Sequence, residues 1–252
     1  MLGAKGDSQG YEPSQALPYD FGTRLTEWVS HPSPIPVGFW RSVGASINTF
    51  AVESMIDELA AGAGQDGYDY RRAKLTDPRW IAVLDAAANL ANWHAPLPNG
   101  RARGIAIGTA FNSIVAAVVE ISGVGASGVA VNRVSIAIDC TVAVNPGSIE
   151  AQLTGGVVHG LNAALYGRQT FTGGAAQSKN FKNSRMIRMN EMPHVDVVII
   201  PGSGLNRAVP IGGVGELGVP TLAPALANAC FKVTGVRNRS LPFFPNATMS
   251  GL

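Results

Sequence analysis

A single acidic residue lies at the centre of a glycine-rich loop in the last fifth of the chain. The loop, Pro210–Pro224, reads PIGGVGELGVPTLAP and holds four glycines around Glu216. Glycine permits close backbone approach and positive φ. Because Val214 and Leu217 flank the acid, we expect a partly desolvated carboxylate, which is the environment of a general base. No Asp or Glu follows Glu216, so no neighbouring charge cluster explains it.

Two other interpretations of this loop compete with a catalytic acid. Gly213–Gly218 spells GxGxxG, but the dinucleotide fingerprint needs a strand directly before it and an acid about twenty residues further on. Here an irregular Gly/Pro stretch precedes the glycines and no acid follows, which disfavours nucleotide binding. The second alternative is an ordinary Gly-rich turn whose glutamate faces water, and the loop taken alone favours that turn.

Composition limits the classes of function. A chain of 252 residues can form one large domain or two modest ones. Charged residues make up 14%, against about 25% in an average soluble domain. A chain with so few charged residues either buries much of its surface in its own fold or has part of that surface covered by a partner. The net charge of +2 gives no support for nucleic acid as a partner.

Metal-ligating residues show no ligand spacing. Cys140 and Cys230 are far apart and form no CxxC or Cys/His cluster, so we expect core thiols and no metal held by side chains. His159 is on a glycine-rich segment, where a core histidine is more common than a ligand. The sequence contains no apolar run of about 18 residues, and its first residues lack the apolar core of a secretory signal.

Residues 1–98 precede the Glu216 loop, and the elements expected in them would position residues that act together with Glu216. Residues 1–16 are polar and predict a disordered tail. Residues 17–98 predict a strand at Phe21–Val29, an FWRSVG loop and two helices. The first helix, Ser46–Ala61, has Val52, Met55, Ile56 and Leu59 as its apolar stripe, and the second begins at the N-cap pair Asp77-Pro78 and runs to about Asn92.

Residues 99–252 predict an α+β segment that carries the GVGE loop. Three β-branched, apolar stretches fit adjacent strands of one sheet: Gly104–Thr109, Ile114–Ser122 and Val129–Ile138. Gly123–Gly128 is a second literal GxGxxG, but strands flank it on both sides, so we interpret it as a hairpin loop. A hairpin at Phe171–Ala176, a strand at Val195–Ile200 and a helix at Ala223–Val233 complete the segment.

A long helix follows the capping pair Asn145-Pro146, and its buried face is Ile149, Leu153, Val157, Leu161 and Leu165. Gly155, Gly156 and Gly160 in this helix each cost about 1 kcal/mol relative to Ala. That cost indicates close packing against another backbone or a ligand, with Gln152 nearby as a donor. Packing alone is the favoured explanation.

Segments in both parts carry a family resemblance. They read PVGFWRSVGASINTFAVESMIDELA (36–60), AIDCTVAVNPGSIEAQLTGGVVHGLNAALYG (137–167) and PIGGVGELGVPTLAPALANACF (210–231), with RGIAIGTAFNSIVAAVVEIS and NFKNSRMIRMNEMPHVDVVIIP between them in the expected order. Together they resemble the molybdopterin-binding large subunit of the xanthine dehydrogenase/aldehyde oxidase family. The most similar branch is the isoquinoline 1-oxidoreductase beta-subunit type, which includes membrane-associated bacterial aldehyde dehydrogenases. The fold implied is α+β, with mixed or antiparallel sheets and packed helices.

The resemblance implies a role for residues that match the family's motifs. Glu216 corresponds to the base beside the molybdenum, and Phe39 and Trp40 to the substrate pocket. Residues expected to bind the cofactor are Arg41, Gly44, Gln152, Gly213, Val214 and Gly215.

The chemistry implied is that of a molybdenum hydroxylase. Its cofactor is a molybdenum-pterin, expected as molybdopterin cytosine dinucleotide, in which the pterin and not the protein holds the metal. An aldehyde or an N-heterocycle is oxidised with water-derived oxygen while Glu216 takes a proton. The implied partners are an N-terminal molybdopterin-binding half or subunit and a 2Fe-2S small subunit that carries the iron–sulfur clusters, with a cytochrome c subunit as an optional third.

The chain also departs from the family pattern. The family's large subunit is much longer, and its GQG-type cofactor loops lie upstream of the region matched here. We therefore expect a C-terminal portion, either a separately encoded half or a truncated chain, that is inactive alone. Thr141 stands where relatives commonly have Gly. By resemblance the location is periplasmic or membrane-associated, and a cytoplasmic one stays open.

A second hypothesis is a non-catalytic remnant or an assembly module of the same fold, and an unrelated α+β binding domain is a third. The retained Glu216 argues against a remnant, because a remnant has no reason to keep a desolvated acid.

Overall fold

A mixed four-stranded sheet forms the centre of the protein, in the order β1-β2-β3-β6. The computed structural model describes residues 7–16, 18–125, 128–202 and 210–245. The pairs β1–β2 and β2–β3 are antiparallel, and β6 joins β3 in parallel. The strand bounds are Arg101–Ala110 (β1), Ser113–Gly125 (β2), Gly128–Asp139 (β3) and His194–Ile199 (β6). The four strands predicted after residue 99 are confirmed.

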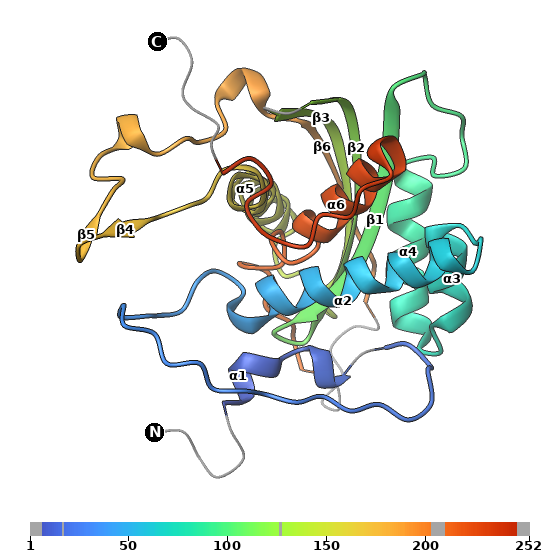
Figure 1. Cartoon of the computed structure of the whole chain (residues 1–252). Helices are drawn as coiled ribbons and strands as arrows, with labels where there is room; N and C mark the ends of the chain where they lie inside the picture. The colour runs from blue at the N-terminus through green and yellow to red at the C-terminus, as the bar shows by residue number, and fades with distance from the viewer. Residues whose placement is uncertain (1–6, 17, 126–127, 203–209, 246–252) are drawn as a thin grey trace.

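Helices cover both faces of this sheet (Figure 1). On one face α5 (Pro146–Leu165) and α6 (Leu222–Thr234) pack against the strands, and on the other face lies α4 (Pro78–Leu90). Side chains of β2 therefore alternate between two cores, with Val115 and Ala117 in one and Ile114 and Ala116 in the other. Burial on both faces explains why the strands are apolar throughout. The α+β fold is confirmed.

Capping side chains fix where the helices begin. The Asp77 carboxylate accepts a hydrogen bond from Arg79 N at 2.8 Å, and the Asn145 side chain accepts one from Ser148 N at 3.0 Å. Both caps were predicted from the sequence. The first part also contains α2 (Val43–Gly62) and α3 (Gly67–Lys74), and a small hairpin, β4 (Phe171–Thr172) with β5 (Ala175–Ala176), confirms another prediction.

The buried face of α2 differs from the predicted stripe. Met55 and Leu59 are exposed, whereas Glu53 and Asp57 are buried. The reason is pairing with arginines: the Arg71 guanidinium of α3 lies 2.8 Å from Glu53 and 3.4 Å from Asp57, and Asp57 also pairs with Arg237 at 2.7 Å. Hydropathy periodicity cannot reveal acids that are buried by pairing with a distant residue.

The predicted disordered tail is wrong for residues 7–16, which are helical in part. The amide of Asn48 donates to the carbonyl oxygens of Gly10 at 3.1 Å and Glu12 at 2.7 Å, and this holds the segment against α2. Residues 1–6 lie outside the described residues. The segment contains α1 (Ser8–Tyr11) and the 3-10 turn η1 (Ser14–Ala16), and further 3-10 turns are η2 (Phe181–Asn183) and η3 (Met189–Glu191).

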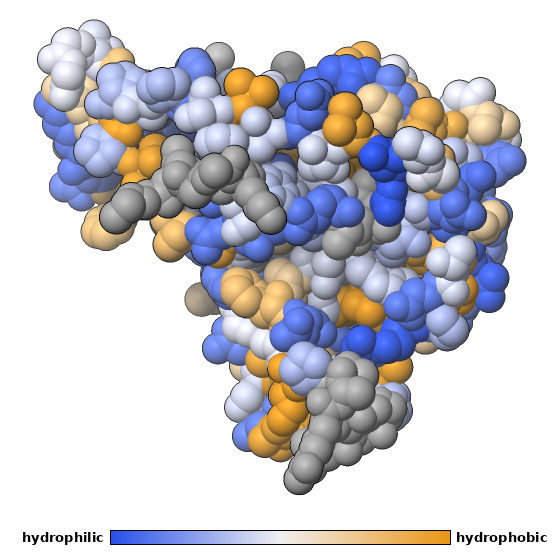
Figure 2. Space-filling view, turned by 90° about the horizontal axis from the view of Figure 1, so that it is seen from below, coloured by the Kyte–Doolittle hydropathy of each residue, from blue (hydrophilic) through white to orange (hydrophobic). Residues whose placement is uncertain are grey.

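The predicted strand at Phe21–Val29 is also wrong. These residues form no strand, and Gly22 and Thr23 lie in a bend. In Figure 1 the N-terminal part of the chain runs as an irregular trace along the lower side before it enters α2. Figure 2 views the molecule from that side and shows apolar residues at several places on the surface. Among the described residues, no helix is both long and apolar enough to cross a membrane.

Candidate functional site

The glycine loop that carries Glu216 is anchored to the ends of two strands. Gly213 N donates to the carbonyl oxygen of Phe111 at 2.8 Å, and Ser113 Oγ donates to the carbonyl oxygen of Gly213 at 2.6 Å. Gly212 N donates to Cys140 O at 3.0 Å, just after β3. These bonds fix the loop beside the β1–β2 turn, and Leu217 then enters the core, completely buried.

The loop also packs directly on α5. A Cβ atom added to Gly156 would lie 2.6 Å from the Cα of Gly218, and one added to Gly160 would lie 3.2 Å from the carbonyl oxygen of Val219. The predicted reason for the helix glycines, close backbone packing, is thus confirmed at Gly156 and Gly160. Gly155 has open space around it, so contact with the loop explains Gly156 and Gly160 but not Gly155.

Arg41 joins the FWRSVG loop to both of these elements. Its Nε donates to the carbonyl oxygen of Gly215 at 2.9 Å, a bond that Nη2 also makes. Nη2 donates to the side-chain oxygen of Gln152 at 3.1 Å and to its carbonyl oxygen at 3.3 Å. The structure therefore brings together three residues that were predicted to act together, from segments far apart in the sequence.

Ser42 holds Glu216 from the same loop. The backbone N–H of Ser42 donates to Oε1 of Glu216 at 3.0 Å, and Ser42 Oγ donates to the carbonyl oxygen of Glu216 at 2.6 Å. Ser42 and Val43 have φ values of 76° and 49°, and such left-handed backbone is strained for residues with a side chain. Our sequence analysis did not identify Ser42; its position directly after Arg41 was the available signal.

One oxygen of Glu216 is left for chemistry. The carboxylate is partly buried, and Oε1 is occupied by Ser42 N. Within the described part of the chain no group donates to Oε2. A carboxylate that is oriented through one oxygen while the other stays available can accept a proton from a group placed against it.

An aromatic pair lies beside this cluster. Trp40 packs on His159 of α5, with ring centroids 4.8 Å apart and planes inclined by 35°. Partial burial and the positive charge of Arg41 lower the pKa of His159, which favours the neutral ring near pH 7. The expected core position of His159 is wrong, because the residue is exposed apart from this contact. Phe39, predicted for the substrate pocket, is 78% exposed.

A hollow of about 460 Å³ opens next to Trp40. Gly160, Val219 and Arg168 contribute to its walls, but neither Phe39 nor Glu216 does. Of the two predicted pocket residues, Trp40 lines this hollow and Phe39 does not.

Two glycines predicted to bind a cofactor are explained by packing. A Cβ atom at Gly44 would lie 1.9 Å from the carbonyl oxygen of Gln9, so the N-terminal segment covers that position. A Cβ atom at Gly213 would lie 2.9 Å from the Cβ of Phe111. Gly215 is exposed, and the nearest atom to an added Cβ is the Gln152 side-chain oxygen at 3.9 Å.

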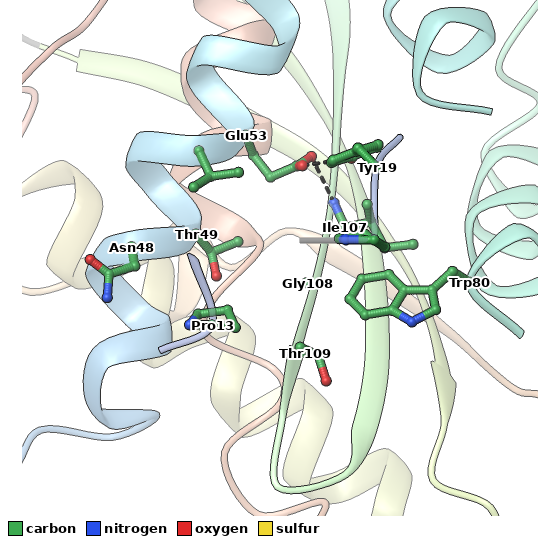
Figure 3. Close-up of a pocket in the computed structure, with 11 residues that line it drawn as sticks. Pro13, Tyr19, Asn48, Thr49, Glu53, Trp80, Ile107, Gly108 and Thr109 are labelled. Atoms are coloured by element: carbon green, nitrogen blue, oxygen red, sulfur yellow. Dashed lines mark hydrogen bonds between the residues drawn. The ribbon is translucent and has the colours of Figure 1, made fainter. Parts of the chain in front are cut away.

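A second carboxylate, Glu53, lies in a small cavity of about 20 Å³ (Figure 3). Its Oε1 accepts a hydrogen bond from Tyr19 Oη at 2.6 Å, and its Oε2 accepts bonds from Arg71 Nε at 2.8 Å and Ile107 N at 3.0 Å. Burial, followed by the charge of Glu53, raises the pKa of Tyr19 well above its usual value, so Tyr19 remains a donor. Both oxygens are occupied, which makes Glu53 a structural acid.

The donors around Glu216 fit one side of an anionic cofactor. Arg41 supplies a guanidinium and Gln152 an amide, next to the exposed Gly215. No group of three or more His, Cys, Asp or Glu among the described residues could hold a metal ion. A metal carried by an organic cofactor suits this donor set.

Comparison with known proteins shows which proteins this chain resembles. Residues 84–193 match a molybdopterin cofactor-binding domain. The chain is 32% identical over 232 residues to the beta subunit of isoquinoline 1-oxidoreductase from Brevundimonas diminuta, covering 90% of this chain and 29% of the relative. It is 33% identical to a subunit of nicotinate dehydrogenase from Pseudomonas putida, covering 89% of this chain and 20% of the relative. The chain thus spans less than a third of these curated relatives.

Solved structures share the fold. Quinoline 2-oxidoreductase from Pseudomonas putida matches with a TM-score of 0.67 at 11% identity, over 82% of this chain and 52% of that chain. The aldehyde oxidoreductase from Desulfovibrio gigas matches with a TM-score of 0.61 at 13% identity, over 81% of this chain and 40% of that chain.

Proposed function

We propose that this chain, which belongs to the molybdopterin-binding large subunits of the xanthine dehydrogenase/aldehyde oxidase family, supplies the base and one side of the cofactor site of a molybdenum hydroxylase. The observation that carries the proposal is the arrangement of Glu216. Its Oε1 is held by Ser42 N while Oε2 is available, and Arg41 fixes the adjacent Gly215 through its carbonyl oxygen.

The proposed reaction is oxidation of an aldehyde or an N-heterocycle with water-derived oxygen. The names of the relatives support these substrate classes, because they refer to isoquinoline, nicotinate and aldehyde. When bound, the molybdenum-pterin cofactor supplies the two-electron redox chemistry. This chain's own part is to take a proton at Oε2 of Glu216 and to place the Trp40–His159 pair beside the site, where a flat heteroaromatic ring could stack.

Arg41 and Gln152 would contact the polar edge of the cofactor, which we propose to be the cytosine dinucleotide form. Gly44, Gly213 and Val214 would contribute through the position of their loops. The proposed partners are an N-terminal molybdopterin-binding part, a 2Fe-2S small subunit and, as a third, a cytochrome c subunit. We also propose a periplasmic or membrane-associated location, because one relative is described as a membrane-bound aldehyde dehydrogenase.

Native mass spectrometry together with elemental analysis for molybdenum and iron tests the proposal. A complex that contains this chain, further large-subunit sequence and molybdenum is the expected result. Assays with aldehydes and N-heterocycles would then identify the substrate. If such a complex formed without molybdenum, the non-catalytic assembly module would be the better interpretation.

A further inference from the structure

The chain leaves β3 through a strained turn that contacts the glycine loop of the candidate site. We call residues 139–142 the β3 turn. Thr141, within it, is buried and has a φ of 70°. This left-handed conformation is unfavourable because the Cβ atom crowds the following carbonyl oxygen, and it is most unusual for a β-branched residue. Such a conformation persists only where the surrounding structure holds it in place.

Asp139 and Arg79 hold the β3 turn from the side of α4. Oδ1 of Asp139 accepts a hydrogen bond from Thr141 N at 2.8 Å, and Oδ2 accepts one from Arg79 Nε at 2.7 Å. Burial raises the pKa of Asp139, but the bonds from Arg79 and Thr141 N outweigh burial and hold that pKa below its usual value. Asp139 is therefore charged at neutral pH, and both of its oxygens are occupied.

The other side of the β3 turn contacts the beginning of the glycine loop. Thr141 Oγ1 donates to the carbonyl oxygen of Pro210 at 3.2 Å, and Gly212 N donates to the carbonyl oxygen of Cys140 at 3.0 Å. A Cβ atom added to Gly212 would lie 2.1 Å from Ser113 Oγ. Gly212 is therefore held between the β3 turn and the turn that joins β1 to β2.

Few residues separate this contact from the proposed base. Only Gly213–Gly215 lie between Gly212 and Glu216. The Ser42 N–H reaches the Glu216 carboxylate from a different segment, so their bond depends on the position of the loop. Misplacement of a reacting group by about 1 Å can cost about 100-fold in rate. A shift of the β3 turn would therefore reach the proposed base.

We propose that Asp139 and Arg79 are positioning residues of the candidate site, which fix the loop of Glu216 through the β3 turn. Neither side chain bonds to Glu216. Their effect passes from α4 to the β3 turn and from the turn to the loop. The inference rests on the proposed function, because the position of Glu216 affects turnover only if Glu216 is the base.

Hydrogen–deuterium exchange of the full chain, followed by NMR, tests this positioning without turnover. Asp139→Asn removes the ion pair with Arg79, and we expect the Gly212 amide to exchange faster by about tenfold or more. Asp196→Asn is the matched control, because it removes a similar pair with Arg133, six residues before Asp139 on β3. Equal exchange of the Gly212 amide in both variants would overturn the proposal and leave the proposed function intact.

Two variants of Thr141 decide the matter if Asp139→Asn does not fold. Thr141→Val keeps the branched shape and removes the hydroxyl that donates to Pro210, whereas Thr141→Ser keeps that hydroxyl. We expect faster exchange of the Gly212 amide in the valine variant and unchanged exchange in the serine variant. Equal exchange in the two variants would show that the β3 turn does not fix the loop, which contradicts the proposal.

A double-mutant cycle on the assembled enzyme shows whether the ion pair acts through Glu216. We expect Asp139→Asn to lower kcat by about tenfold or more, with unchanged KM and molybdenum content. Once Glu216→Gln is present, Asp139→Asn should cause no further loss, because the group that it positions is already gone. Equal losses in both backgrounds would indicate a general structural role and overturn the proposal. If Glu216→Gln alone kept full activity, the proposed function would be wrong as well.

Discussion

The backbone N–H of Ser42 and its hydroxyl both bond to Glu216, one to the carboxylate at 3.0 Å and one to the carbonyl oxygen at 2.6 Å. The left-handed backbone at Ser42 and Val43 aims that N–H at the acid. The strain of these two residues is therefore tied to the orientation of the proposed base, and each part of the arrangement can be tested separately.

Replacing the proposed base should greatly reduce turnover without unfolding the protein. In Glu216→Gln the side-chain oxygen can still accept the Ser42 N–H, but the proton acceptor is lost. We expect kcat of the assembled enzyme to fall by about 10²–10⁴-fold, with an unchanged melting temperature and molybdenum content.

This experiment also separates the enzyme from a non-catalytic remnant. Glu150→Gln, at an exposed position on α5, is a control that should keep full activity. If turnover survived Glu216→Gln at the control's level, Glu216 would not be the base.

The Ser42 hydroxyl can be removed in two ways that differ in backbone strain. Ser42→Ala loses the bond to the Glu216 carbonyl, which costs about 1 kcal/mol of folding free energy, and keeps the unfavourable φ of 76°. Ser42→Gly loses the same bond but adopts that φ without strain. Chemical denaturation should therefore rank the glycine variant as the more stable, and the opposite order would show that the strain does not lie at Ser42.

Neighbouring glycines of α5 provide a matched pair for the loop contact. Gly156→Ala would place a Cβ 2.6 Å from the Cα of Gly218, so we expect a loss of about 1–3 kcal/mol from overpacking and reduced molybdenum content. Gly155 has open space, and Gly155→Ala should raise helix stability by up to about 1 kcal/mol. Equal effects in both variants would show that the loop does not depend on close contact with α5.

The fold was largely predictable because its signals are local. The β-branched stretches of β1, β2 and β3 and the caps Asp77 and Asn145 each act within a few residues. The errors arose where a distant residue decides the structure. Arg71 makes burial of Glu53 possible, and Phe21–Val29 has a strand pattern although no described strand pairs with it.

The site was predictable only in part, and mostly through the family resemblance. Loop chemistry alone favoured a solvent-facing Glu216, and spacing could not indicate that Arg41 reaches Gln152 across more than a hundred residues. Ser42 was missed because its bond to the Glu216 carboxylate comes from its backbone N–H, a group that every residue except proline possesses. Contacts that main-chain groups make cannot be predicted from the types of side chain in the sequence.

Among the charged residues, the buried Arg71 should be the one whose replacement lowers the stability of the fold most. It has no solvent exposure, and it donates to Glu53 and to the carbonyl oxygen of Gly67. Arg71→Met would leave Glu53 and Asp57 as buried acids without their shared partner, and breaking such a pair costs about 3–5 kcal/mol.

Arg72→Met is the control, because Arg72 is 48% exposed in its pair with Asp85 and should lose no more than about 1 kcal/mol. Urea denaturation measures both values. The buried cluster joins α2 and α3 to Ile107 of β1, and α2 begins directly after the Arg41–Ser42 loop. The Arg71 variant should therefore also lose molybdenum at temperatures where the control retains it, and equal stability of the two variants would show that the cluster does not hold α2 in place.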